Sequence, residues 1–468
     1  MTIVTHTITD LLVPLLKEIH SMASAMNVLS LNNRKGLGNY LEILGSADLA
    51  GQNLSIAILK QLIENIETEF LNRPGRTTFY HVKSHHPRTL LTIFGPLTYY
   101  RTFYKNVKTE ESYCHVDSFL GLRKYDYFCP YVKALVTEAA CDSSFAAAGR
   151  HVSATVGNRV SLKGNPVLIS RQTARSFVKE SKLVSPSPQK MKSTPPTLFL
   201  MLDEKYIHTQ NNEGKDIVVH HAVLFEAILP VGKQRKRNKL VNKRMFSSMN
   251  GDLNKQVLDY IDQVYDVNKI QRIYVLGDGA NWIKGSVGEY KFEKNEVFFA
   301  LDKYHFKQAL RHITLDDDLS EQMLEHILEG EMDSFKGMCS VLQSQNEHRR
   351  DTIEEKKNYV INNWAAILLS YHDNLTCCME GQISHNLASL FTSRPKGYSK
   401  ETLIKLLCAR TQHRNGYNTR ELFLSDYQNE NQRNSYHSTL DFSIFDSLFK
   451  DEIHHIGKKG AIGLSYSK

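Results

Sequence analysis

The sequence predicts an α/β protein in which a mixed sheet is interrupted by an all-helical insertion and preceded by a mainly helical N-terminal region. Segments of β character follow residue 197, and a helical pattern runs through Leu253–Val264 between them. From Phe306 to about Asp373 the pattern is almost wholly helical. Strands, then a helix, then further strands are typical of layered α/β folds. At roughly 150 residues per domain, the chain of 468 residues has room for about three structural units.

Composition places the chain among ordinary globular proteins. Hydrophobic residues make up 41% and charged residues 23%, which excludes disordered, collagenous and membrane classes. Lys and Arg outnumber Asp and Glu by 58 to 50, and this modest basic excess permits a polyanionic partner without demonstrating one. No signal peptide, membrane-length apolar run or C-x-x-C pair is present. We therefore expect a reduced, cytoplasmic protein with no membrane partner.

A cluster of prolines divides the chain. Pro186, Pro188, Pro195 and Pro196 stand among Ser and Lys residues, which predicts a linker over 181–196. Before it we expect an N-terminal α+β region over 1–130 and a helical region over 131–180. After it we expect the first part of the sheet domain over 197–305, the helical insertion over 306–375, and a return to the sheet domain with a final helix and C-terminal tail over 376–468.

The N-terminal region contains both kinds of element. Apolar residues at helical spacing predict a helix over Asp48–Leu71, and alternation around the turn at Gly95 predicts strands within Thr89–Phe103.

The helical region that precedes the linker has the features of a DNA-binding unit. Short helices are predicted over Val132–Ala140, Ser144–Val156 and Ser170–Lys179. The last opens with a Ser cap and carries polar and basic residues, as the recognition helix of a helix-turn-helix unit does. A small helical bundle with arginines on its surface explains the same pattern, so both interpretations stay open. The residues that would contact DNA are Arg171, Gln172 and Arg175.

Two strongly apolar runs end in an acidic residue. Asp203 follows the run Thr197–Leu202, and Asp278 follows Arg272–Gly277. Because ligands gather beyond the ends of strands in open α/β sheets, the two carboxylates are candidate metal ligands. The alternative is that each Asp caps the turn or helix that follows it.

A pair of hard cations requires a third acidic ligand, because Mg²⁺ or Mn²⁺ ions about 3.5–4 Å apart are held between Asp and Glu oxygens. Glu380 is the best choice, since it follows the helical insertion and precedes a basic turn suited to phosphate contacts. The cations of that turn are Arg394 and Lys396. Three other carboxylates compete with Glu380: Asp373, Glu354 and Glu355.

Together these motifs resemble the ISLre-type bacterial insertion-sequence transposases, a group related to the Mutator-like DDE transposases. The resemblance extends from about Arg88 to about Cys408, and its motifs stand in the order that the family has. They are Phe94–Thr98, Arg101–Tyr104, Leu202–Glu204, Gly277–Lys284, Asp302–His305, Glu380–His385 and Ser393–Ser399.

The resemblance implies an RNase H-like catalytic domain. In that family the first Asp lies on strand one, the second follows strand four, and a Glu lies on a late helix beyond an all-helical insertion. The resemblance implies that Asp203, Asp278 and Glu380 of this chain are catalytic metal ligands for two Mg²⁺ or Mn²⁺ ions. Asp302 and His305 match a signature that follows the second Asp in that family. The implied reaction is DNA strand cleavage followed by strand transfer.

The implied partners are the two ends of a mobile element and a target duplex, with at least a dimer assembled on DNA. Two other activities share these residues. One is a metal-dependent nuclease that cuts without joining, and the other is a DNA-binding protein that has lost activity.

Further residues have two interpretations each. His305 either orients or protonates a group near the scissile phosphate or serves as a structural hydrogen-bond partner. Trp282 either stacks on a splayed base or closes the core beneath the site, and Lys284 lies in the same segment. The basic run after Pro230 either tracks phosphates or is a solvated charged loop. Its candidate DNA-binding residues are Lys233, Arg235, Lys236 and Arg237.

Overall fold

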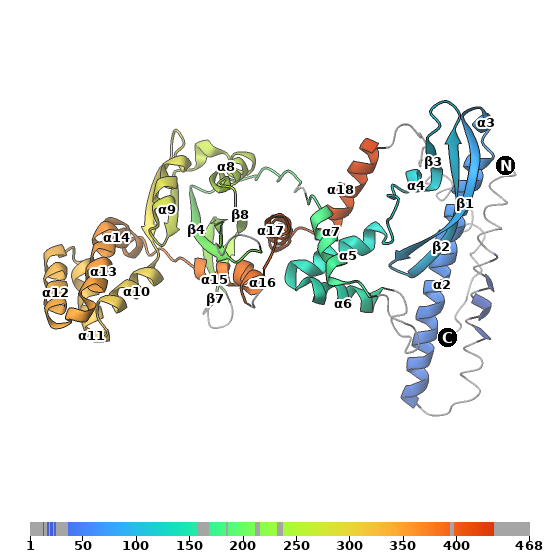
Figure 1. The fold of residues 1–468 in the computed structure, drawn as a ribbon. Coiled ribbons are helices and arrows are strands. Elements are labelled where there is room, and N and C mark those ends of the chain that lie inside the picture. The colour runs from blue at the N-terminus through green and yellow to red at the C-terminus, as the bar shows by residue number, and fades with distance from the viewer. Residues whose placement is uncertain are drawn as a thin grey trace, which may run out of the picture.

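The computed structural model describes residues 36–156, 168–183, 186–210, 216–231, 237–393 and 397–434, with isolated positions between 13 and 24. An N-terminal β-hairpin lies at one end of the molecule, a mixed sheet in the middle and a helical subdomain at the other end (Figure 1). Among the described helices, none combines the length and the apolar character that a membrane crossing requires.

A long hairpin packed on one helix forms the N-terminal region. The strands pair antiparallel from Tyr80 with Asn106 to Thr92 with Gly95, and the helix α2 contacts β2. Tyr99 and Tyr104 are fully buried beneath this contact. The elements are α2 (Gly36–Leu71), α3 (Arg76–Phe79), β1 (Tyr80–Thr92), β2 (Gly95–Asn106), β3 (Ser112–Cys114) and α4 (His115–Phe119).

Three helices follow, as the sequence predicts. They are α5 (Pro130–Asp142), α6 (Phe145–Thr155) and α7 (Arg171–Glu180), and each contacts the other two. The Ser170 side chain accepts a hydrogen bond from the Thr173 backbone N–H, so the predicted Ser cap of α7 is confirmed. Their shared core includes Val132, Val152 and Phe177.

A five-stranded mixed sheet confirms the α/β class. Its strand order is β10-β9-β4-β5-β8, with β4, β9 and β10 parallel and β5 antiparallel to both β4 and β8. A separate antiparallel pair, β6 with β7, extends the hairpin between β5 and β8. The elements are β4 (Thr197–Ile207), β5 (Ile217–Phe225), β6 (Ala227–Val231), β7 (Arg237–Val241), β8 (Arg244–Ser248), α8 (Leu253–Val264), η1 (Val267–Lys269), β9 (Arg272–Gly277), α9 (Asn281–Ser286), η2 (Val287–Tyr290) and β10 (Glu296–Leu301).

Helices cover both faces of this sheet. Leu198, Leu200 and Leu202 of β4 face a core that contains Val257 and Ile261 of α8. Met201 faces the opposite core, which contains Met379 and Leu403 from the C-terminal helices. Alternate residues of one strand therefore point into different cores, as expected for a sheet covered on both sides.

The helical insertion has a hydrophobic core of its own, which includes Phe306, Phe335 and Val360. Its helices begin three residues earlier than predicted, because Asp302 caps the first of them through a hydrogen bond from the Tyr304 N–H. The elements are α10 (Lys303–Ile313), α11 (Asp317–Leu328), α12 (Met332–Gln345), η3 (Glu347–Arg349), α13 (Arg350–Asn362) and α14 (Trp364–His372).

The chain then returns to the sheet through a helix with a π-helical turn. Buried Arg410 donates hydrogen bonds to the carbonyl groups of Asn386 and His385 in this segment and to that of Cys141 in α5. It therefore ties the N-terminal helices to the sheet domain. The elements are α15 (Met379–Ile383), the π-helix η4 (Ser384–Ala388), α16 (Ser389–Phe391), α17 (Lys400–Arg414) and α18 (Thr419–Asn434).

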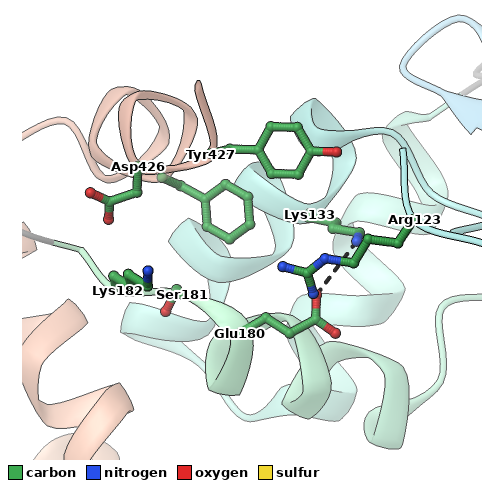
Figure 2. A pocket seen from close by; sticks show the side chains of 8 residues that line it. Arg123, Lys133, Glu180, Ser181, Lys182, Asp426 and Tyr427 are labelled. Atoms are coloured by element: carbon green, nitrogen blue, oxygen red, sulfur yellow. Dashed lines mark hydrogen bonds and ion pairs between the residues drawn. The ribbon is translucent and has the colours of Figure 1, made fainter. Parts of the chain in front are cut away.

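The beginning of the predicted linker is packed against the protein. Ser181 and Leu183 are buried, and Leu183 shares a core with Phe423 of α18. Figure 2 shows a small pocket at this junction, where Glu180 lies beside the cationic groups of Arg123 and Lys133. The segment 181–183 therefore belongs to the helical region that precedes it.

Replacing Arg410 tests this connection. Arg410→Met removes the hydrogen bonds that this buried guanidinium donates to the carbonyl groups of Asn386, His385 and Cys141, and we expect it to lower the free energy of unfolding by roughly 3–5 kcal/mol. Urea denaturation followed by circular dichroism measures the change. Arg420→Met is the control, because Arg420 is 41% exposed where it pairs with Glu138, and we expect a loss below about 1 kcal/mol. Equal losses in the two variants would contradict the proposed tie.

Candidate carboxylate site

Asp203 and Asp278 meet because their strands run parallel. The register pairs Met201 of β4 with Leu276 of β9, so each Asp lies two residues beyond a paired position at the same end of the sheet. A Cβ at Gly277 would lie 3.1 Å from the Leu202 carbonyl oxygen and 2.7 Å from the Ile283 side chain. Glycine is therefore required for this close approach of the two strands.

The turn that carries Asp278 is fixed from two sides. The Asp278 carboxylate accepts a hydrogen bond from the Ala280 N–H at 2.9 Å, and Gly279 has a φ of 87°. The Tyr359 hydroxyl, from α13 in the helical insertion, donates to the Asp278 carbonyl oxygen at 2.7 Å. Tyr359 is a positioning residue that the sequence did not reveal, since it stands in a highly charged helix without a distinguishing motif.

Glu380 lies in the first turn of α15, which packs on β4. The preceding residue, Met379, is buried in the core that contains Met201, and the Cys378 N–H contacts the Met201 sulfur at 3.3 Å. Glu380 itself is exposed. The helix therefore anchors through its apolar side and presents the carboxylate to solvent.

The pKa of Asp203 is shifted by its burial and by the charges of the other two candidate carboxylates. Burial raises the pKa of Asp203 to about 6, against a hydrogen bond from the Glu204 N–H that lowers it. The negative charges of Asp278 and Glu380 raise this pKa further, and His305 lowers it. The charged groups that shift the pKa of Asp203 therefore come from the turn after β9, from α10 and from α15.

His305 is held by Asp302. Its Nδ1 lies 2.9 Å from the Asp302 carboxylate, and the Asp302 N–H in turn donates to the Gly277 carbonyl. The hydrogen bond with Asp302 raises the pKa of His305, and the charges of Asp278 and Asp203 add to this effect. With Nδ1 engaged, Nε2 is the ring atom available to a substrate. The side chain is 32% exposed.

The donor set fits hard divalent cations. Carboxylate oxygens are the ligands that Mg²⁺ and Mn²⁺ prefer, and a half-buried carboxyl with two acidic neighbours gains stability from positive charge. The ligand atoms of the three residues do not all fall within 4.8 Å of one another; in the described ranges, only His326, Glu329 and Glu331 do so.

A buried histidine lies directly across from Asp203. His221 of β5 pairs with Asp203 in the sheet register and is 1% exposed. Its Nδ1 lies 2.8 Å from the Ser247 hydroxyl, and its Nε2 is 3.4 Å from the Asn386 side-chain nitrogen. Burial lowers the pKa of His221 to about 4. No sequence pattern distinguishes the buried His221 from the adjacent His220, which is partly exposed.

Of the three predicted DNA contacts on α7, two are exposed and one is engaged in hydrogen bonds within the protein. Arg171 and Gln172 are exposed. The Arg175 guanidinium instead donates to the hydroxyl groups of Thr402 and Ser399 at the start of α17, and Lys179 pairs with Glu401 at 2.6 Å. One side of α7 is thus occupied by the sheet domain.

The other predicted DNA contacts lie around the sheet. Trp282 is half-buried, its ring 4.4 Å from that of His220, and it packs against the core beneath the sheet. Lys284 lies in α9 and is half-buried. Arg237 begins β7. Outside the described residues lie Lys233, Arg235, Lys236, Arg394 and Lys396.

The fold and the site define an α/β protein with an acidic cluster at the carboxyl edge of its sheet. A family profile described as "Uncharacterised protein family (UPF0236)" matches residues 47–428. The chain therefore belongs to the UPF0236 family.

Relatives from Caldanaerobacter subterraneus subsp. tengcongensis cover most of their own length and most of this chain. UPF0236 protein TTE2489 is 26% identical over 400 residues, which are 83% of this chain and 81% of the relative. A second relative is 25% identical over 411 residues, 85% and 82% of the two chains, and its name joins eleven loci from TTE0033 to TTE2212. A third, 26% identical over 400 residues (83% of this chain and 80% of the relative), has a name that joins four loci.

The buried His221 predicts a pH dependence of stability. Its folded pKa of about 4 lies below the ordinary value near 6.5, so its contribution is fully present above pH 6.5 and is lost as pH falls toward 4. The difference in unfolding free energy between the parent and His221→Gln should shrink by up to about 3 kcal/mol from pH 7 to pH 4. Chemical denaturation at each pH measures it.

The exposed His348 supplies the control for this measurement. His348→Gln should keep the pH dependence of the parent. A difference between the parent and His221→Gln that is constant with pH would show that His221 titrates normally in the folded protein.

Proposed function

We propose that this protein is a DNA transposase of the DDE class with an RNase H-like catalytic domain. The observation that carries the proposal is the parallel pairing of β4 with β9, which brings Asp203 and Asp278 to the same end of the sheet, while the charge of Glu380, 177 residues after Asp203, raises the pKa of Asp203. Nothing in a purely structural role requires three carboxylates at one solvent-accessible edge, where their mutual repulsion opposes folding.

The topology supports the RNase H-like assignment. In chain order the sheet strands are β4, β5, β8, β9 and β10, so Asp203 lies on the first strand and Asp278 directly follows the fourth. Glu380 follows the insertion formed by α10–α14. The resemblance to the ISLre-type transposases implies this placement of the acidic residues.

The relatives support a mobile element. One relative's name joins eleven loci of a single genome, and another joins four. A protein that copies or moves its own gene leaves such a distribution, whereas most metabolic enzymes are encoded once or a few times.

Each side chain has a defined role in the proposed reaction. Asp203, Asp278 and Glu380 would hold divalent cations, whose chemistry when bound would be Lewis-acid activation of the attacking water or DNA 3′-hydroxyl and stabilisation of the leaving oxygen. His305, oriented by Asp302, would donate a proton or hydrogen bond from Nε2 to a phosphate or leaving oxygen. The Tyr359 hydroxyl and Gly279 would hold Asp278 in place while DNA binds.

Substituting the carboxylates tests the proposal. We expect Asp203→Asn, Asp278→Asn and Glu380→Gln each to lower metal-dependent cleavage and strand transfer on the order of 10³-fold or more, because each removes an anionic ligand. DNA binding measured in EDTA should be retained. Cleavage and joining of element-end duplexes are scored separately on gels.

Glu204→Gln is the matched control, because Glu204 neighbours Asp203 but approaches His220 at 3.6 Å. It should keep near-parent activity. Cleavage without joining would identify a nuclease on this fold, and DNA binding without metal-dependent cleavage would identify an inactive DNA-binding protein. Parent-like joining by Asp278→Asn would refute the proposed site.

The role of His305 has a separate test. We expect His305→Gln to lower the cleavage rate roughly 10²-fold, the lower end for loss of a positioned acid or base, with little change in melting temperature. The comparison variant Asp302→Asn should lower the rate less and shift the pH–rate profile to lower pH, because the pKa of His305 falls without its partner. A lower melting temperature with an unchanged rate would assign His305 a structural role.

A further inference from the structure

The positive charge of the chain is concentrated in one segment. Residues 70–109 contain no Asp or Glu but carry seven Lys and Arg residues and three His residues. The net charge of the whole chain is +8, so this segment of +7 leaves a net charge of about +1 for all other residues. The segment forms α3 and the hairpin of β1 and β2.

Two of these cations point inward and are only partly compensated. Arg88 pairs with the Asp117 carboxylate of α4 at 2.8 Å, and Arg101 pairs with the same carboxylate. Arg88 also donates to the backbone carbonyl groups of Arg123 and Asp126 at 2.7 Å. Because one carboxylate faces two guanidinium groups, this group of three side chains keeps a net positive charge.

Most of the other basic groups are exposed, and we call this set the basic ribbon: Arg73, His81, Lys83, His86, Lys105 and Lys108. Lys105 pairs with Glu110 at 3.1 Å, but the two side chains are 48% and 76% exposed, so solvent screens the pair strongly. Tyr100 on the same hairpin is 62% exposed. Uncompensated cations beside exposed aromatic groups are typical of nucleic-acid surfaces.

We propose that the basic ribbon binds the phosphate backbone of duplex DNA. This inference rests on the proposed transposase function and adds a DNA contact distinct from those expected on α7 and in the basic loop. Charge complementarity favours this partner, since the segment 70–109 contains only cationic charged side chains, and these match the regularly spaced negative charges of a nucleic-acid backbone.

The dimensions of the hairpin agree with this partner. Strand β2 has 12 residues, which at about 3.4 Å per residue extend roughly 40 Å, close to one turn of B-DNA. A two-stranded ribbon also fits the major groove. The hairpin lies at the end of the molecule opposite the helical insertion (Figure 1), where a duplex reaches it without crossing the acidic site.

The salt dependence of DNA binding tests the proposal. The variant combines Arg73→Gln, Lys83→Gln and Lys108→Gln in the full chain, and the probe is a 30-base-pair duplex of random sequence in EDTA. Each lost phosphate contact lowers the slope of log K against log salt by about 0.9, so we expect a decrease of about 2–3. At 0.1 M salt the affinity should weaken on the order of 100-fold.

The matched control combines Lys255→Gln, Lys269→Gln and Lys294→Gln. These residues are exposed, and Lys269 and Lys294 precede β9 and β10 at the sheet edge opposite Asp278. The control should keep the slope and affinity of the parent. Both variants should also keep the parent melting temperature, because all six positions are at the surface.

The outcomes separate this inference from the proposed function. An unchanged slope and affinity in the ribbon variant overturns the inference, and continued metal-dependent joining by that variant leaves the transposase proposal intact. A ribbon variant that loses affinity for single strands but not for duplexes also overturns it. A parent protein that binds no DNA overturns the proposed function itself.

Discussion

The parallel pairing of β4 with β9 is the constraint on which the site depends. Because Met201 lies opposite Leu276 in the last paired position of β4 and β9, Asp203, which lies within β4, and Asp278, which follows β9, come to the same end of this pairing. A one-residue slip in register would reverse which side chains face each core. A Cβ at position 277 would lie 3.1 Å from the Leu202 carbonyl oxygen, so glycine at this position allows the two strands to pair closely. The acidic cluster is therefore a consequence of strand packing.

The helical insertion supports the site, although it stands apart as a subdomain with its own core. Its helix α13 supplies the Tyr359 hydroxyl to the Asp278 carbonyl, and α14 packs against β10. Its first helix is capped by Asp302, the residue that also holds His305. One carboxylate thus couples the start of the insertion to the orientation of the imidazole.

Local sequence patterns predicted the helices and strands, whereas contacts between residues far apart in the sequence determine which side chains are exposed and which are engaged within the protein. The helix Leu253–Val264 was predicted with its observed bounds, because Leu253, Val257 and Ile261 repeat at helical spacing. The strand β1 begins at Tyr80, nine residues before the predicted segment, since its polar first half lacks apolar alternation. The hydrogen bonds of Arg175 span more than 220 residues, and no local pattern encodes them. The acidic cluster was predicted from Asp-tipped strands and a resemblance, and its chemistry stays a prediction.

Metal-assisted cleavage of DNA makes opposite electrostatic demands on one protein. Carboxylates that hold cations repel phosphate, so a site built from Asp203, Asp278 and Glu380 does not by itself attract its substrate. At 0.1 M salt each field decays over about 10 Å, which allows an acidic site and a basic surface to act independently when they lie in different regions of the molecule. The chain satisfies this condition, because most of its net positive charge belongs to the segment 70–109 and the candidate carboxylates belong to the sheet domain, and the N-terminal hairpin and the sheet lie in different regions of the molecule (Figure 1). In the proposed transposase, this spatial separation of charge would allow the affinity for DNA and the chemistry at the phosphodiester to be tuned separately.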